Sequence, residues 1–166
     1  MKVLSLDISS STIGWSTIII NNDLSFPALD SYGYIKPSKK GELCERALDG
    51  RNKYIKLLND EKPDVVVVED YASKFSRGKS SARTIIVLAV FNEMIKMTTV
   101  ETVNFIPISY PVATIRSVIS KEFSDSVSDK SDVLSFCQKK FLNYKTTLNR
   151  VDNIKKECYD ECDSII

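Results

Sequence analysis

The most regular pattern in the chain is the alternation of aliphatic and other side chains in residues 2–8, KVLSLDI. It predicts a β-strand with one apolar face and with Asp7 on the opposite face. Residues 64–70, DVVVVED, place four valines in succession, which is typical of a central strand covered by helices on both faces. These patterns, with other β-branched and apolar runs, predict strands over residues 2–8, 15–20, 31–36, 64–70 and 103–109.

Apolar residues at helical spacing fill the stretches between and after these strands. Ser109 is expected to cap one helix, with Pro111 in its first turn. The predicted helices cover residues 42–59, roughly 15–20 residues from Ala82, and residues 109–120, 129–142 and 149–166.

The order of these elements predicts the fold class. Three early strands joined by short turns can form an antiparallel meander, and each later helix is long enough to connect parallel strands. We therefore expect an α/β protein with a five-stranded mixed sheet and helices on both faces. A chain of 166 residues without a linker or a repeat is expected to form one domain over residues 1–166.

Composition and charge narrow the class of protein. The formal net charge of +1 excludes a globally basic nucleic-acid binder, so such binding must come from local patches. Asp7 interrupts the first apolar run, which argues against a signal peptide, and the longest such run, IIVLAV, is too short for a membrane span. The four cysteines include no CxxC pair and are interpreted as reduced thiols of a cytoplasmic protein.

The chain contains no histidine. This excludes Ser-His-Asp and Cys-His catalysis, histidine general bases and histidine-rich zinc sites. Any chemistry must use carboxylates, lysines, hydroxyls or thiols.

Two acids stand at or near the carboxyl ends of predicted strands. Asp7 lies in a strand that is otherwise apolar, and Glu69 follows the four valines. Each could be the first polar residue of a turn. In open α/β sheets, however, ligands bind outside the carboxyl ends of the strands, so both are candidate site residues.

Asp160 and Asp163 are three residues apart on the final predicted helix and share one side of it, roughly opposite its apolar stripe. They could form a solvated face. If they instead meet Asp7 and Glu69, four carboxylates make an all-oxygen site that suits Mg²⁺ or Mn²⁺. Two such ions can assist an in-line phosphoryl displacement without a histidine base.

Four segments carry a family resemblance: LSLDISSSTIGWS, PDVVVVEDY, DKSDV and YDECDSII. In their order and spacing they resemble the RuvC-type Holliday junction resolvases of the RNase H-like superfamily, over nearly the whole chain. The resemblance implies an RNase H-like fold, with Asp7, Glu69, Asp160 and Asp163 as catalytic metal-binding acids for two ions.

The same resemblance implies further partners and residues. Lys130, in DKSDV, matches a family lysine near the scissile phosphate, and Arg116 lies where a second basic residue is expected. Family members act as homodimers on four-way DNA junctions, and the composition is similar to that of bacteriophage versions. The opening SLDISSSTIG lacks the proline and first glycines of the family pattern GxDPGxxxTG, so the family's cut-site preference need not carry over.

Residues 74–83, KFSRGKSSAR, form a basic segment without an acid directly after the strand that carries Glu69. It is suited to binding DNA phosphates, or it could be a solvated surface loop. Tyr71 and Phe75 could stack on an unpaired base, although core packing is an alternative for Tyr71. The basic residues expected to bind DNA in this segment are Lys74, Arg77, Lys79 and Arg83.

The next helix, TIIVLAVFNEMIKM, is apolar on more than one side. One side would pack on the sheet and the other on a second copy of the chain, unless the helix over residues 129–142 covers it as a third layer. The function expected from all these features is a divalent-metal-dependent endonuclease acting on branched DNA, chiefly four-way junctions. The alternatives are a nuclease for forks, three-way junctions, flaps or RNA, and a junction-binding protein without catalysis.

Overall fold

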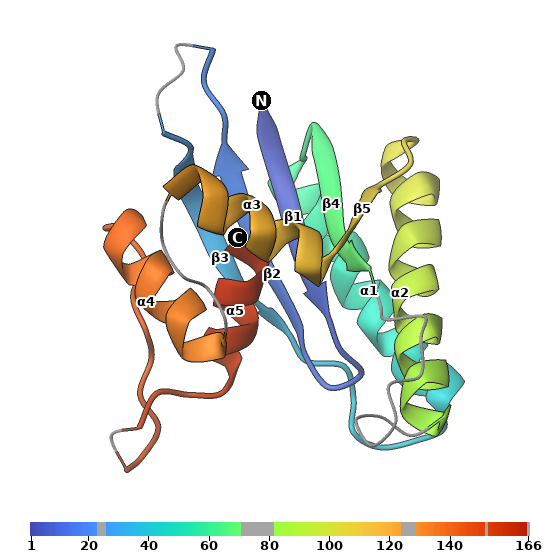
Figure 1. The fold of residues 1–166 in the computed structure, drawn as a ribbon. Coiled ribbons are helices and arrows are strands. Elements are labelled where there is room, and N and C mark those ends of the chain that lie inside the picture. The colour runs from blue at the N-terminus through green and yellow to red at the C-terminus, as the bar shows by residue number, and fades with distance from the viewer. Residues whose placement is uncertain (23–25, 71–81, 124–128, 152, 166) are drawn as a thin grey trace.

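A mixed β-sheet forms the centre of the molecule in the computed structural model (Figure 1). The structure describes residues 1–22, 26–70, 82–123, 129–151 and 153–165. The strands are β1 (Lys2–Ile8), β2 (Ile13–Ile19), β3 (Ala28–Ile35), β4 (Val65–Asp70) and β5 (Ile108–Pro111). The helices are α1 (Leu43–Glu61), α2 (Ala82–Val103), α3 (Val112–Phe123), α4 (Lys130–Lys140) and α5 (Glu157–Ile165).

The strand order is β3-β2-β1-β4-β5. Strands β1, β2 and β3 pair antiparallel, whereas β1 with β4 and β4 with β5 pair parallel. Helices α1 and α2 cover one face of the sheet, and α3, α4 and α5 lie on the other (Figure 1). The mixed sheet predicted from the sequence is therefore confirmed.

The first core lies between the sheet and the α1–α2 pair. Leu4 and Leu6 of β1 point to this face together with Val66 and Val68, their register partners on β4. Tyr54 of α1 and Phe91 of α2, both fully buried, complete the layer. Since side chains alternate along a strand, Asp7 must face the other side of the sheet.

The second core lies on that other side and holds α5 in place. Cys162 and Ile165 of α5 pack with Val133, Phe136 and Cys137 of α4. All five side chains are buried. Helix α4 therefore serves as an outer layer over α5, on the face opposite α2, so the expectation that it might cover α2 is wrong.

Helix α5 approaches β2 at two small residues. A Cβ atom added at Gly14 would lie 2.1 Å from the backbone oxygen of Asp160, so only glycine permits this contact. Two residues along the same face, the buried Ser16 hydroxyl donates to the backbone oxygen of Ser164 at 2.7 Å. Together these contacts fix the distance between α5 and the sheet.

The fifth strand and the helix that follows it differ from their predicted bounds. The fifth strand is Ile108–Pro111 rather than residues 103–109, because α2 continues to Val103 and ends at Asn104, whose φ is +60°. Ser109 and Pro111 consequently lie in the strand and not at the start of a helix. The Ser109 cap and the position of Pro111 were predicted wrongly.

The final helix is shorter than predicted and begins at Glu157 instead of residue 149. The side chain of Asn149 accepts hydrogen bonds from the backbone N–H groups of Val151 and Asn153. Leu148 and Ile154 form an isolated antiparallel bridge around this turn. Asparagine favours such local hydrogen bonds over a helix interior, which explains the error.

We predict that Gly14→Ala lowers the free energy of unfolding by roughly 1–3 kcal/mol or more, because α5 must move away from β2. Urea denaturation followed by circular dichroism measures the change. Gly50→Ala in α1 is the matched control, since its added Cβ would meet its nearest atom at 3.4 Å. The control should be neutral or stabilising by up to about 1 kcal/mol, and equal losses in both variants would contradict the proposed contact.

Candidate active site

Asp7 and Glu69 lie on the same face of two adjacent parallel strands. Val3 pairs with Val65 and Ser5 with Val67, so the same alternation places Asp7 and Glu69 toward α5, at the carboxyl ends of their strands. Asp70 lies on the opposite face, where it forms an ion pair with Lys96 of α2 at 3.6 Å. Glu69 therefore faces the cluster and Asp70 does not.

Asp160 and Asp163 are brought to these strands by α5. The expectation that they might form a solvated face is wrong, because Asp160 is only 8% exposed and the Asp163 side chain only 10%. The charges of Glu69, Asp163 and Asp160 all act on Asp7. The structure therefore brings the four predicted acids to one place.

Lys130 joins this cluster from the start of α4. Its Nζ lies 3.0 Å from Oδ2 of Asp163 and 3.4 Å from Oδ1 of Asp160. The position is fixed by Asp129, the N-cap of α4, whose side chain accepts from the backbone N–H groups of Ser131 and Asp132. The predicted lysine thus contacts the predicted acids directly.

Burial and like charge shape the protonation of the cluster. Desolvation, followed by the charges of Glu69, Asp163 and Asp160, raises the pKa of Asp7 well above its usual value, although Lys130 opposes the rise. Burial also raises the pKa of Asp160 against the opposing effect of Lys130. For Lys130, burial lowers the pKa, but its interactions with Asp163, Asp160 and Asp7 outweigh that effect and raise it. Four carboxyl groups thus lie near a single lysine, and a bound cation would relieve the repulsion among their charged forms.

The chemistry of these donors fits a hard divalent ion, because the carboxylates supply only oxygen atoms. In the arrangement seen, no three acidic or cysteine side chains among the described residues surround one point closely enough to hold a metal ion. The Lys130 ammonium lies between Asp160 and Asp163 instead. Binding of an ion would therefore require these side chains to shift.

Glu161 is buried beside Tyr144 of the second core rather than beside Asp7 and Lys130. It is buried, and burial raises its pKa, while hydrogen bonds with Cys158 and Tyr144 lower it. Its side chain thus has structural partners of its own.

Sequence reasoning missed Asn92, which lies next to Glu69. Asn92 of α2 is 2% exposed, and its Nδ2 donates to the backbone oxygen of Glu69 at 2.9 Å. Its Oδ1 has no hydrogen-bond partner within the described part of the chain. A buried asparagine inside the apolar run VLAVFNEMI was the available signal, because such residues need a partner.

The predicted DNA-binding residues are only partly described. Arg83 lies in the first turn of α2 and is exposed. Arg116 lies in α3, and its side chain is outside the described part of the structure. The other predicted residues, Tyr71, Lys74, Phe75, Arg77 and Lys79, are outside the described residues.

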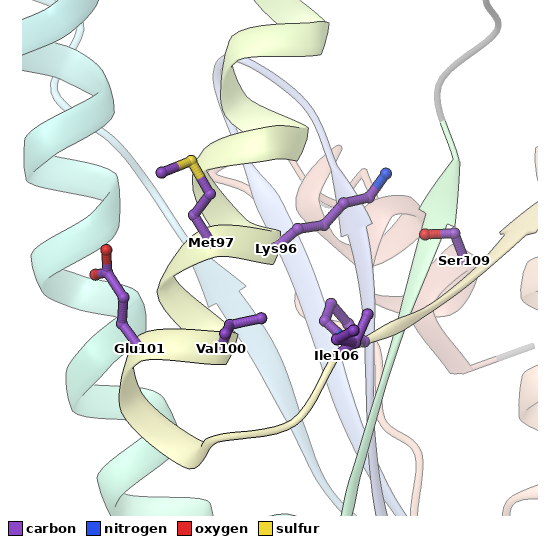
Figure 2. A pocket seen from close by; sticks show the side chains of 7 residues that line it. Lys96, Met97, Val100, Glu101, Ile106 and Ser109 are labelled. Carbon is purple, nitrogen blue, oxygen red and sulfur yellow. The ribbon is translucent and has the colours of Figure 1, made fainter.

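The outer side of α2 and the neighbouring strand β5 form an apolar surface. A pocket of about 460 Å³ lies there between Met97, Val100, Ile106 and Pro107, and Figure 2 shows their side chains beside Lys96. Met97 is 61% exposed and Ile106 82%. This surface, the α2–β5 surface, contains none of the candidate acids.

No helix in the described residues is long and apolar enough to cross a membrane.

Neither protein-family models nor curated protein sequences match the chain. The order and direction of the strands, with helices on both faces, are those of the RNase H-like fold, as predicted from the sequence.

Solved structures of the same fold include Holliday junction resolvases. RuvC of Thermus thermophilus in complex with a Holliday junction substrate matches with a TM-score of 0.71 and 14% identity, over 99% of this chain and 90% of that one. The yeast mitochondrial resolvase Ydc2 matches with a TM-score of 0.69 and 14% identity, over 98% and 74%. At these identities the comparisons establish the fold.

We predict that Asp7→Asn stabilises the metal-free protein at neutral and alkaline pH. The pKa of Asp7 is higher in the folded than in the unfolded state, so the free energy of unfolding falls as pH rises from about 3.8 through the folded pKa. The substitution removes that loss. The melting temperature of the variant should therefore exceed that of the wild type at pH 8, and the difference should shrink as the pH is lowered.

Differential scanning fluorimetry in EDTA measures the effect, since 1 kcal/mol shifts the melting temperature by roughly 2–4 °C in a protein of this size. Asp60→Asn, at an exposed position of α1, is the control and should show no such rise. A lower melting temperature for Asp7→Asn at pH 8 would contradict the assigned repulsion.

Proposed function

We propose that this protein is a divalent-metal-dependent endonuclease that hydrolyses phosphodiesters in branched DNA, chiefly four-way junctions. The observation that carries the proposal is the meeting of Asp7, Glu69, Asp160 and Asp163 with Lys130 at the carboxyl ends of β1 and β4. The shared fold with junction resolvases supports the choice of substrate.

The four carboxylates would hold Mg²⁺ or Mn²⁺, with two ions in each site. Such ions supply Lewis-acid stabilisation of the phosphoryl oxygens and a water of lowered pKa. Asp7 and Glu69 would hold their oxygens still because both stand on strands of the sheet. Asp160 and Asp163 would supply the remaining oxygens from α5, which is held at Gly14 and Ser16.

Lys130 would have two successive roles. In the structure its ammonium offsets part of the repulsion among the acids. With ions and DNA bound, the same side chain, which is 54% exposed, would turn toward a non-bridging oxygen of the scissile phosphate. Arg116 and the basic segment, which includes Phe75 and Arg83, would bind the flanking DNA together with Tyr71.

The α2–β5 surface supports a homodimer. Large apolar side chains on it are exposed to solvent, and β5 is an edge strand of the sheet. Apolar patches of this kind mark protein interfaces. Two copies joined here would place two active sites on one branched substrate and allow paired cuts.

We predict that Glu69→Gln lowers junction cleavage by at least about 10³-fold, equivalent to about 4 kcal/mol of the barrier, while junction binding in Ca²⁺ is kept. Asp70→Asn is the matched control on the opposite face and should cut normally. The assay uses a labelled four-way junction with Mg²⁺ or Mn²⁺, with three-way, flap and RNA–DNA hybrid substrates as competitors. Undiminished cutting by Glu69→Gln would refute the mechanism, and preferred cutting of another substrate would refute the substrate choice.

We also predict that Met97→Glu converts the dimer to a monomer, because it introduces a charge into the apolar contact. Size-exclusion chromatography with light scattering measures the mass at micromolar concentration. Leu142→Glu, at a position 91% exposed beyond α4, is the control and should remain dimeric. A monomeric wild type, or a dimeric Met97→Glu variant, would exclude this interface.

A further inference from the structure

A second pocket, of about 440 Å³, lies between the start of α1 and the first turns of α2. Two arginines line it, Arg46 from α1 and Arg83 from α2, beside Ile86, Val87 and the single acid Glu42. None of the four candidate acids lines it. It is therefore a site separate from the acid cluster, and its chemistry is basic and partly apolar.

Arg46 is held rigidly at this pocket. Its Nε donates to the backbone oxygen of Ser38 at 3.2 Å and its Nη2 to that of Ser10 at 2.8 Å. The guanidinium carbon also lies 6.0 Å from the centre of the Phe91 ring. These bonds use two of the five N–H groups of an arginine, so a fixed guanidinium retains donors for an anion.

Arg83 adds a second positive charge to the pocket. It is exposed and forms no ion pair with any carboxylate among the described residues. Glu42 is the single acid among the described residues that line the pocket, so its charge offsets only one of the two arginines. The pocket consequently carries net positive charge, which suits a phosphate group.

The pocket lies close to the acid cluster along the chain. Arg46 donates a hydrogen bond to the backbone of Ser10, which follows Asp7 by three residues. The Cα atoms of Asp7 and Ser10 are therefore at most about 11 Å apart. One strand of B-DNA carries a phosphate every ~3.4 Å along the axis. A strand that passes the cluster and continues past the β1–β2 turn would therefore bring one of its following phosphates toward this pocket.

We propose that Arg46 and Arg83 form a binding site for one backbone phosphate of the DNA, on the opposite side of the β1–β2 turn from the acid cluster. This inference rests on the proposed function, because it takes DNA as the ligand. It adds Arg46, which sequence reasoning did not identify, to the DNA-binding residues. It also gives Arg83 a defined partner on the protein.

The test measures junction binding in Ca²⁺ over a series of salt concentrations. Arg83→Ala should reduce the slope of log affinity against log salt by about one, the amount expected for one lost phosphate contact. Arg46→Lys keeps the charge but loses the planar fork, and should weaken binding by several-fold. Lys56→Ala, at an exposed position in the middle of α1, is the matched control and should leave both quantities unchanged.

A second measurement locates the phosphate. Single neutral methylphosphonates are placed at each position within four nucleotides of the branch point, and binding is measured for wild type and Arg83→Ala. One position should weaken wild-type binding by several-fold and have no further effect on Arg83→Ala. An unchanged salt slope for Arg83→Ala would overturn the proposed phosphate site. So would a loss of affinity from each methylphosphonate that adds fully to the loss caused by Arg83→Ala. These assays measure binding and need no cleavage. A wild type that does not cut DNA would therefore refute the proposed nuclease activity, while the binding results would still test the phosphate site.

Discussion

The contact between α5 and β2 is the constraint on which the candidate site depends. At Gly14 the backbone of α5 touches the sheet with no side chain between them, and Ser16 adds a buried hydrogen bond to the same helix. Asp7 is the register partner of Gly14 on β1. Because Gly14 has no side chain, α5 can approach β2 closely enough for Asp160 and Asp163 to lie near Asp7 on β1.

This contact has an electrostatic cost that the rest of the structure offsets. Pressing α5 onto the sheet brings Asp160 and Asp163 toward Asp7 and Glu69, and burial strengthens their mutual repulsion. The apolar packing of α4 on α5 works against that repulsion. Helix α4 also contributes Lys130, so one element supplies both the packing and the compensating charge.

The sequence was most informative where local patterns determine structure. Alternation in β1 predicted the face that Asp7 takes, since the period of a strand is fixed, and the valines of β4 predicted a central strand covered on both faces. The apolar spacing after residue 149 predicted a helix. The side chain of Asn149 instead accepts backbone hydrogen bonds from Val151 and Asn153 and forms a turn. The contacts of Asn92 and Arg46 depend on how separate helices pack, and no periodicity along one segment contains that information.

The hydrogen bond between Ser16 and Ser164 joins residues 148 positions apart. Helix α5 is synthesised after every other described element, so a nascent chain displays Asp7 and Glu69 long before the acids that complete the site exist. Closing such a long loop also carries a larger entropic cost than closing the short turns between β1, β2 and β3. A chain whose synthesis has not reached α5 therefore lacks both Asp160 and Asp163, and its candidate site is incomplete.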